Sequence, residues 1–218
     1  LYYIKRYDEA WMLMNQALDI AIQIDSKKQI VACHKQLYYL CREFKRMMNE
    51  RGDEQASTLF FRESLLHEMY FSEKPRLAEL TVRYEALRCD IMQQYYMNKD
   101  YDNVIRIATS LDFHDDADPN ASCLVYYYKA QAYVKLENYP MAKEAFFREL
   151  ELRKKYLGWE EEDTILACQN LGVLHSFCNE REEALACFRE AYGYEVKKNG
   201  EDSEMAQKLL QYISVVES

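Results

Sequence analysis

The residues of this chain that look most like metal ligands lie in the segment HDDAD. It places His114, Asp115, Asp116 and Asp118 close together, and imidazole and carboxylate groups are common ligands of divalent cations. The segment lacks the glycine and the distal glutamate of a calcium-binding loop. It also belongs to LDFHDDADPNAS, which has the densest loop composition in the chain. We therefore expect a polar connection with an N-cap for the following helix.

A second group with reactive side chains consists of Cys33, His34, Cys41 and His67. Thiols and imidazoles at suitable spacing bind zinc or form Cys-His catalytic pairs. Here no two cysteines stand close together and no third partner is indicated. We therefore assign these residues to the core or to a helix surface, and His175 to packing. The sequence predicts no metal and no cofactor.

Other catalytic signatures do not occur in the sequence. It has no Gly-rich phosphate loop, no nucleophile-elbow motif and no known metal-ligand spacing. The acidic run from Glu160 to Asp163 is better explained as a helix start, where negative side chains favour the positive end of the helix dipole. We predict that the chain is not an enzyme, unless a catalytic domain adjoins it.

Net charge and the lack of a visible membrane span argue against nucleic acid and membrane as partners. The 218 residues include 37 Asp and Glu against 28 Lys and Arg, for a formal net charge of -9. Binding to a phosphate backbone depends on a dense basic surface, and the short basic runs 27–28 and 153–155 are typical of solvated helix ends. No membrane span or signal peptide is visible. We therefore expect neither nucleic acid nor membrane as a partner.

Cysteine usage bears on the cellular compartment. The seven cysteines are an odd number, are scattered along the chain and stand mostly among apolar residues. Buried cysteine behaves as a small hydrophobic residue, and unpaired thiols favour a reducing compartment. We therefore expect a cytoplasmic protein.

The elements that must position these residues are helices. The chain is 49% hydrophobic and 30% charged, with 5 Gly and 3 Pro, as expected for amphipathic helices joined by short turns. Apolar residues recur at helical spacing, for example at Trp11, Met14 and Leu18. A single helix pair cannot bury such stripes alone, so neighbouring pairs must stack.

A spacing of small and bulky residues recurs along the chain. Gly172, Ala184 and Ala191 are small, as needed where two antiparallel helices approach closely, and Phe188 fills the space beside them. The recurrence interval of roughly 40 to 50 residues lies near the range of helical solenoids. The small residue stands at Ala10, Ala56, Val104, Ala142 and Ala184, and its partner four residues later is Met14, Phe60, Ala108, Phe146 and Phe188.

The segments CQNLGVLHSFCNEREEALACFREAY and YYYKAQAYVKLENYPMAKEAFFREL resemble the tetratricopeptide repeat family. That family's pattern is aromatic, Leu-Gly, aromatic, then Ala, aromatic, Ala; His175 and Lys129-Ala130 depart from it. The resemblance implies an all-α, right-handed superhelical solenoid of antiparallel helix pairs over residues 1–218. The repeats expected are 1–26 (truncated), 27–73, 76–115, 120–159 and 162–200, followed by a capping helix at 203–217.

Two local resemblances bear on function. ALDIAIQIDSKKQIVACHKQLYYL and RESLLHEMYFSEKPRLAELTVRYE resemble tetratricopeptide sensor regions of bacterial signalling proteins. FFRELELRKKYLGWEEEDTILACQNLGVL resembles the longer repeats of kinesin light chains, which hold short peptides. Two functions are therefore open: a protein- or peptide-binding scaffold that uses the concave groove, or a sensor or regulatory segment of a larger bacterial signalling or transcription-regulatory protein.

In this family the first helix of each pair lines the groove. The positions carried over are Gln93, Tyr96, Leu124, Tyr127, Gln131, Lys135, Gln169, Val173 and Phe177, with Val134, Leu166 and Ser176 beside them. The Lys and Asn that clamp a C-terminal carboxylate in some members are not matched. The resemblance therefore implies a peptide held by apolar anchors and backbone hydrogen bonds. Residues that pack against a neighbouring helix would show the same spacing, so that alternative stays open.

The start of the chain suggests a third alternative. Tyr7, Ala10 and Met14 follow the pattern of a second helix, so residues 1–4 would be the tail of a preceding one. Such an arrangement would leave Trp11 and Met14 with an uncovered face. Exposed apolar faces mark interaction sites, so self-association through the ends of the array is also considered.

Overall fold

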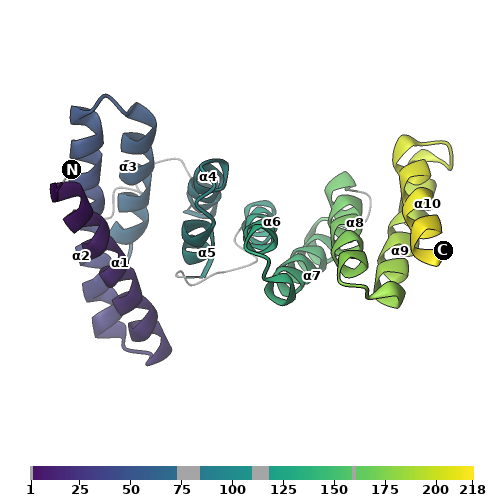
Figure 1. The fold of residues 1–218 in the computed structure, drawn as a ribbon, viewed down its shortest axis with the longest axis horizontal. Coiled ribbons are helices and arrows are strands. Elements are labelled where there is room, and N and C mark those ends of the chain that lie inside the picture. Colours follow the sequence, from purple (N-terminus) through teal and green to yellow (C-terminus); the bar gives the residue numbers. More distant parts are fainter. Residues whose placement is uncertain (1, 73–83, 110–117, 159–160) are drawn as a thin grey trace. The chain divides into compact units, whose positions relative to one another are not determined.

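In a computed structural model of the protein (Figure 1), the chain is built from α-helices. The structure describes residues 2–72, 84–109, 118–158 and 161–218, without the side chains of residues 2–8, 84 and 85, and these ranges contain no strand. The helices are α1 (Tyr2–Gln23), α2 (Lys27–Glu50), α3 (Glu54–Glu68), α4 (Tyr84–Met97), α5 (Tyr101–Thr109), α6 (Pro119–Lys135), α7 (Tyr139–Tyr156), α8 (Glu162–Phe177), α9 (Arg181–Asn199) and α10 (Glu204–Glu217). The predicted all-α class is confirmed.

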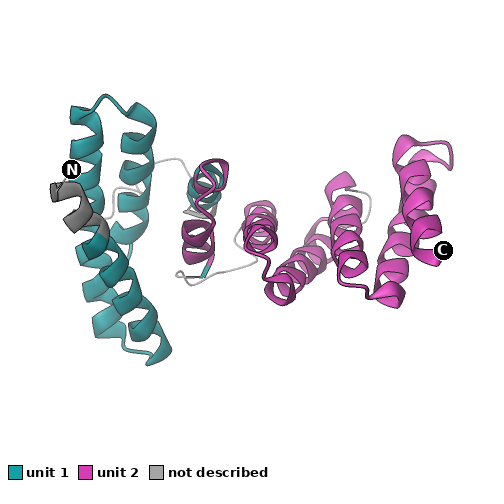
Figure 2. Cartoon of the chain, in the orientation of Figure 1, with its two compact units in different colours: residues 1–94, 109–112 teal, residues 95–108, 113–218 magenta. Residues whose placement is uncertain are grey.

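The helices belong to two compact units (Figure 2). Unit 1 comprises residues 1–94 and 109–112, and unit 2 comprises residues 95–108 and 113–218. In unit 1, α2 packs against both α1 and α3. In unit 2, each helix from α6 to α10 packs against the next one in sequence. Amphipathic helices thus cover one another's apolar stripes in chain order.

The turns inside the helix pairs repeat one backbone pattern. In each turn one residue has a positive φ between 57° and 73°, the left-handed region in which helices commonly end: Gly52, Lys99, Glu137 and Asn179. In three of these turns, the residue that follows caps the next helix. Its side-chain oxygen accepts a hydrogen bond from the backbone N–H of the residue three positions further along the chain. These capping residues are Asp53, Asp100 and Asn138. A repeated helix pair needs such a recurring turn.

The packing of α8 on α9 depends on Gly172. A methyl group at this position would lie 2.7 Å from Cε1 of Phe188 and 3.0 Å from Cβ of Cys187. Ala184 and Ala191 are fully buried in the same core. The predicted role of small residues around Phe188 is therefore confirmed.

Trp11 does not lie on an uncovered face, so that expectation was wrong. No Gly or Pro interrupts residues 1–23, and α1 is one continuous helix that turns Trp11 toward α2. The Trp11 ring packs edge-on against Phe44 and Phe60, with centroid distances of 5.7 and 6.3 Å, and only 9% of the residue is exposed. Among the side chains of α1 that the structure describes, the large apolar ones that are exposed are instead Met12, Leu13, Ile20 and Ile22.

Backbone geometry and local hydrogen bonds define several helix ends. α9 ends at Gly200, whose φ is 87°, and Ser203 caps α10 by accepting from the N–H of Ala206. Asp118 caps α6 by accepting from the N–H of Ala121, while residues 114–116 of the HDDAD segment lie outside the described residues. Among the described helices, none has both the length and the apolar character needed to span a bilayer.

Candidate functional site

A cavity of about 250 Å³ opens on unit 2 between α6, α7 and α8. Its walls are mainly apolar and aromatic, and two amide side chains add polar groups. The lining residues are Gln131, Val134, Tyr139, Phe146, Asn170, Val173, Leu174 and Phe177. An apolar hollow with a few placed polar groups is the usual form of a ligand site.

Helical spacing explains how α8 presents its side of the cavity. Asn170, Val173, Leu174 and Phe177 stand at positions i, i+3, i+4 and i+7, which lie on one face of a helix. At the outer end, the ring of Phe177 lies 5.0 Å from that of Tyr139 of α7. Phe177 is nevertheless 66% exposed. Much of its apolar surface therefore faces solvent and is available to a ligand.

A run of aromatic rings continues from the cavity over unit 2. The Tyr127 ring lies 6.5 Å from that of Phe146 and 5.4 Å from that of Tyr128. The Tyr96 ring lies 5.7 Å from that of Tyr128 and 5.6 Å from that of Tyr101. Tyrosine offers a flat apolar surface together with a hydroxyl group, so the run extends the cavity with contact surface of the same kind.

Two phenols of this run, those of Tyr96 and Tyr127, stay protonated at neutral pH. Burial, and then the charges of Tyr96 and Glu149, raise the pKa of Tyr127, while a hydrogen bond with Gln131 lowers it in part. Burial and the neighbouring Tyr101 raise the pKa of Tyr96. Because a tyrosine hydroxyl ordinarily titrates near pH 10, both groups can donate hydrogen bonds at neutral pH.

The structure brings some of the predicted groove residues together and separates others. Gln131, Val173 and Phe177 line the cavity together with Val134. Tyr96 and Tyr127 belong to the aromatic run. Three other predicted groove residues are exposed but do not line the cavity: Gln93, Leu124 and Lys135.

Gln169 differs from the expectation because it is buried. Only 5% of the residue is exposed, and its Oε1 makes no hydrogen bond to any described residue. The adjacent Asn170 lines the cavity in its place. Successive helix residues point about 100° apart, so the groove face is centred on Asn170, Val173 and Phe177. Asn170 stands three residues before Val173 and seven before Phe177, and this helical spacing could have identified it from the sequence.

Comparison with known proteins establishes the type of fold. No family model and no curated protein sequence matches the chain. Among solved structures, the crystal structure of BtubC (BKLC) from P. vanneervenii is similar, with a TM-score of 0.54 and 14% sequence identity over 96% of this chain and 82% of that chain. BtubC is a helical-repeat protein. The chain therefore has the helical-repeat fold that the sequence predicted.

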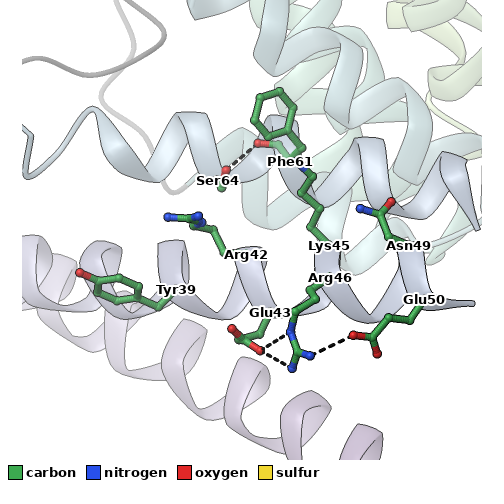
Figure 3. A pocket seen from close by; sticks show the side chains of 9 residues that line it. All are labelled: Tyr39, Arg42, Glu43, Lys45, Arg46, Asn49, Glu50, Phe61 and Ser64. Atoms are coloured by element: carbon green, nitrogen blue, oxygen red, sulfur yellow. Dashed lines mark hydrogen bonds and ion pairs between the residues drawn. The ribbon is translucent and has the colours of Figure 1, made fainter.

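A larger hollow of about 520 Å³ lies in unit 1 between α2 and α3, and most of its lining side chains are polar or charged. Figure 3 shows the guanidinium group of Arg46 between Glu43 and Glu50, with ion-pair distances of 2.9 Å to each. Nζ of Lys45 lies 4.4 Å from the centre of the Phe61 ring. Because carboxylates already compensate the Arg46 charge, we consider this hollow a poorer candidate for a ligand site than the cavity of unit 2.

His175 has a polar contact in addition to the packing role that we expected. Its Nδ1 lies 2.6 Å from Oε2 of Glu180, and Glu180 also pairs with Lys143 of α7. Hydrogen bonds from Lys143 and then His175 lower the pKa of the Glu180 carboxyl. This carboxylate therefore links the last turn of α8 to α7.

Proposed function

We propose that the chain is a protein-interaction module of the tetratricopeptide type, which binds a peptide segment in the cavity formed by α6, α7 and α8. The observation that carries this proposal is the convergence of an exposed apolar wall and two amide side chains on one cavity. The similarity to BtubC supports a helical-repeat scaffold, and such scaffolds present extended binding surfaces.

The size of the cavity favours a peptide side chain over a small molecule. Pockets for drug-sized ligands usually measure about 300–1,000 Å³, whereas this cavity measures about 250 Å³. It suits one bulky apolar side chain. The amides of Gln131 and Asn170 each carry a donor and an acceptor, so they can pair with the backbone N–H and C=O groups of an extended peptide.

The chemistry of the lining supports binding without catalysis. The described side chains that line the cavity include no carboxylate, imidazole, thiol or amine. They can hold a ligand but offer no strong acid, base or nucleophile for neutral pH.

A reducing compartment such as the cytoplasm suits a chain with an odd number of cysteines.

The test is selection of a phage-displayed random peptide library on the purified chain, followed by calorimetric titration with the enriched peptides. Phe177→Ala and Asn170→Ala should each weaken binding by about tenfold or more, because they remove an apolar anchor and a backbone partner. Phe147→Ala is the matched control, since Phe147 is 54% exposed on α7 and does not line the cavity. Failure to enrich any peptide, or equal affinity in all variants, would overturn the proposal.

A further inference from the structure

A buried cluster of metal-ligand side chains lies in unit 1, between α2 and α3. The Sγ of Cys41, a carboxylate oxygen of Glu63 and a ring nitrogen of His67 all lie within 4.8 Å of one another. Cys41 and Glu63 are 0% exposed and His67 is 1% exposed. We propose that this cluster binds a zinc ion or a similar transition-metal ion.

The two helices present the three ligands from facing surfaces. Glu63 and His67 stand four residues apart on α3, so they share one face of that helix. Cys41 stands on α2, which packs directly against α3. The short turn at residues 51–53 joins the two helices and fixes their register. The three side chains of the cluster therefore come from one helix pair.

His34 is placed to orient the imidazole of His67. The Nδ1 atoms of the two rings are 2.9 Å apart, so one ring donates a hydrogen bond to the other. With its Nδ1 engaged in this way, His67 directs Nε2 toward Glu63, whose Oε1 is 3.7 Å away. Metal-binding histidines commonly hold their second ring nitrogen in such a hydrogen bond. His34 is itself held by stacking on Tyr70, with ring centroids 3.7 Å apart.

A divalent cation at this place would match the charges of the ionised ligands. An ionised carboxylate and a thiolate would together carry two negative charges in the core, which is costly unless a cation compensates them. The two positive charges of a divalent ion would balance those two ligand charges while His67 stays neutral, and the ion itself promotes ionisation of the thiol. The competing explanation is a metal-free network in which Glu63 is protonated or pairs with protonated His67.

The kinds of donor atom select the metal. Calcium and magnesium prefer oxygen ligands throughout, whereas zinc accepts the sulfur, nitrogen and oxygen donors that this cluster combines. Zinc bond lengths of about 2.0–2.3 Å require donor atoms less than about 4 Å apart. The side chains therefore need to move inward only slightly. Three protein ligands leave a fourth position for water.

The experiment uses the full chain, stripped with a chelator and then titrated separately with zinc and cobalt(II) salts. We expect one zinc ion bound per chain, and a thiolate-to-cobalt charge-transfer absorption in the near ultraviolet. Cys41→Ser should abolish that absorption and weaken zinc binding by at least about 100-fold. His34→Leu should weaken it by about 10–100-fold, as loss of an orienting partner does elsewhere.

The matched control is Cys89→Ser, because Cys89 is also buried in unit 1 but lies outside the cluster. It should retain both the absorption and the zinc affinity, and circular dichroism checks that each variant is folded. If Cys41→Ser does not fold, the titrations of the unmodified chain and of His34→Leu decide. The proposal is overturned if the unmodified chain binds neither ion with micromolar affinity, or if Cys41→Ser keeps the cobalt absorption. Either result would leave the metal-free network as the explanation.

Discussion

At Gly172 the ring of Phe188 occupies the space that any side chain would need. A methyl group there would lie 2.7 Å from Cε1 and 2.9 Å from Cδ1 of that ring. We expect Gly172→Ala to lower the free energy of unfolding by about 1–3 kcal/mol, because overpacking forces α8 and α9 apart. This loss should exceed the gain of up to about 1 kcal/mol in helix propensity. Denaturant unfolding followed by circular dichroism measures the change.

Gly193 on α9 provides the control for this substitution. Apart from its chain neighbours and the backbone of its own helix, no atom of the described residues lies within 4 Å of a methyl group at that position. Gly193→Ala should therefore raise the free energy of unfolding by about 0.5–1 kcal/mol through helix propensity alone. The two Gly→Ala changes should have opposite signs, and stabilisation by both would show that α8 does not depend on the small residue.

Glu149 should make the stability of the chain depend on pH. Its carboxyl group is 1% exposed and accepts a hydrogen bond from Nε of Arg153 at 2.8 Å. Burial raises the pKa of Glu149 from 4.5 to about 7, and Arg153 offsets only part of this effect. The folded state therefore binds a proton more tightly than the unfolded state. This contribution to stability is fully present below pH 4.5 and is lost as the pH rises through about 7.

The matching experiment compares the unmodified chain with Glu149→Gln, which cannot ionise. As the pH rises across this window, the free energy of unfolding of the unmodified chain should fall relative to the variant by up to about 3 kcal/mol. Urea unfolding at a series of pH values measures the difference. A difference that stays constant with pH would mean that Glu149 keeps its charge in the folded state.

At the scale of single residues, the sequence predicted side chains whose positions follow from helix spacing. Val173 and Phe177 reach the cavity because Leu171-Gly172 fixes which face of α8 meets α9. Tyr139 and Phe146 were missed as lining residues because they come from α7, the second helix of its pair. Their rings are long enough to reach the groove from the packing side, and repeat spacing does not show this.

At the scale of elements, a substitution in the turn between α6 and α7 should stabilise the protein. Glu137 adopts a φ of 57°, in a left-handed region that costs a residue with a side chain about 1–2 kcal/mol. Gly52 occupies the same place in the α2–α3 turn without that cost. Glu137→Gly should therefore raise the free energy of unfolding by about 0.5–1 kcal/mol, as measured by denaturant unfolding.

Glu144→Gly is the comparison for that change, since Glu144 is an exposed residue in the interior of α7. There the loss of helix propensity should cost about 1 kcal/mol. Equal destabilisation by both substitutions would mean that the Glu137 side chain makes a contact worth more than its backbone strain.

Helix ends could be predicted from the sequence, whereas the pairing of distant side chains could not. The stop at Gly200 and the caps at Asp118 and Ser203 are local signals that act within one turn. By contrast, His34 and His67 are 33 residues apart, and their contact depends on the register of α2 against α3. Spacing along either helix alone does not fix that register, so the sequence assigned both residues to ordinary packing.

At the scale of the whole molecule, we expect different groups of helices to unfold with different free energies. Packing in both units follows chain order, from α1 to α3 and from α6 to α10. In arrays of this kind, stability is approximately a sum of repeat terms and nearest-neighbour terms. Local openings then involve groups of adjacent helices and have different free energies in different parts of the chain.

Hydrogen exchange of the Gly172→Ala variant tests this division. Helices α7 and α10 pack directly against α8 and α9. Overpacking between α8 and α9 should therefore weaken the packing interactions of α8 with α7 and of α9 with α10. Amide exchange should therefore accelerate in α7 to α10, by about tenfold for each 1.4 kcal/mol lost. Exchange in α2 and α3 should keep the rates of the unmodified chain. Equal acceleration in α2, α3 and α8 would show that the chain unfolds as one cooperative body, because only global unfolding would then expose the amides of distant helices.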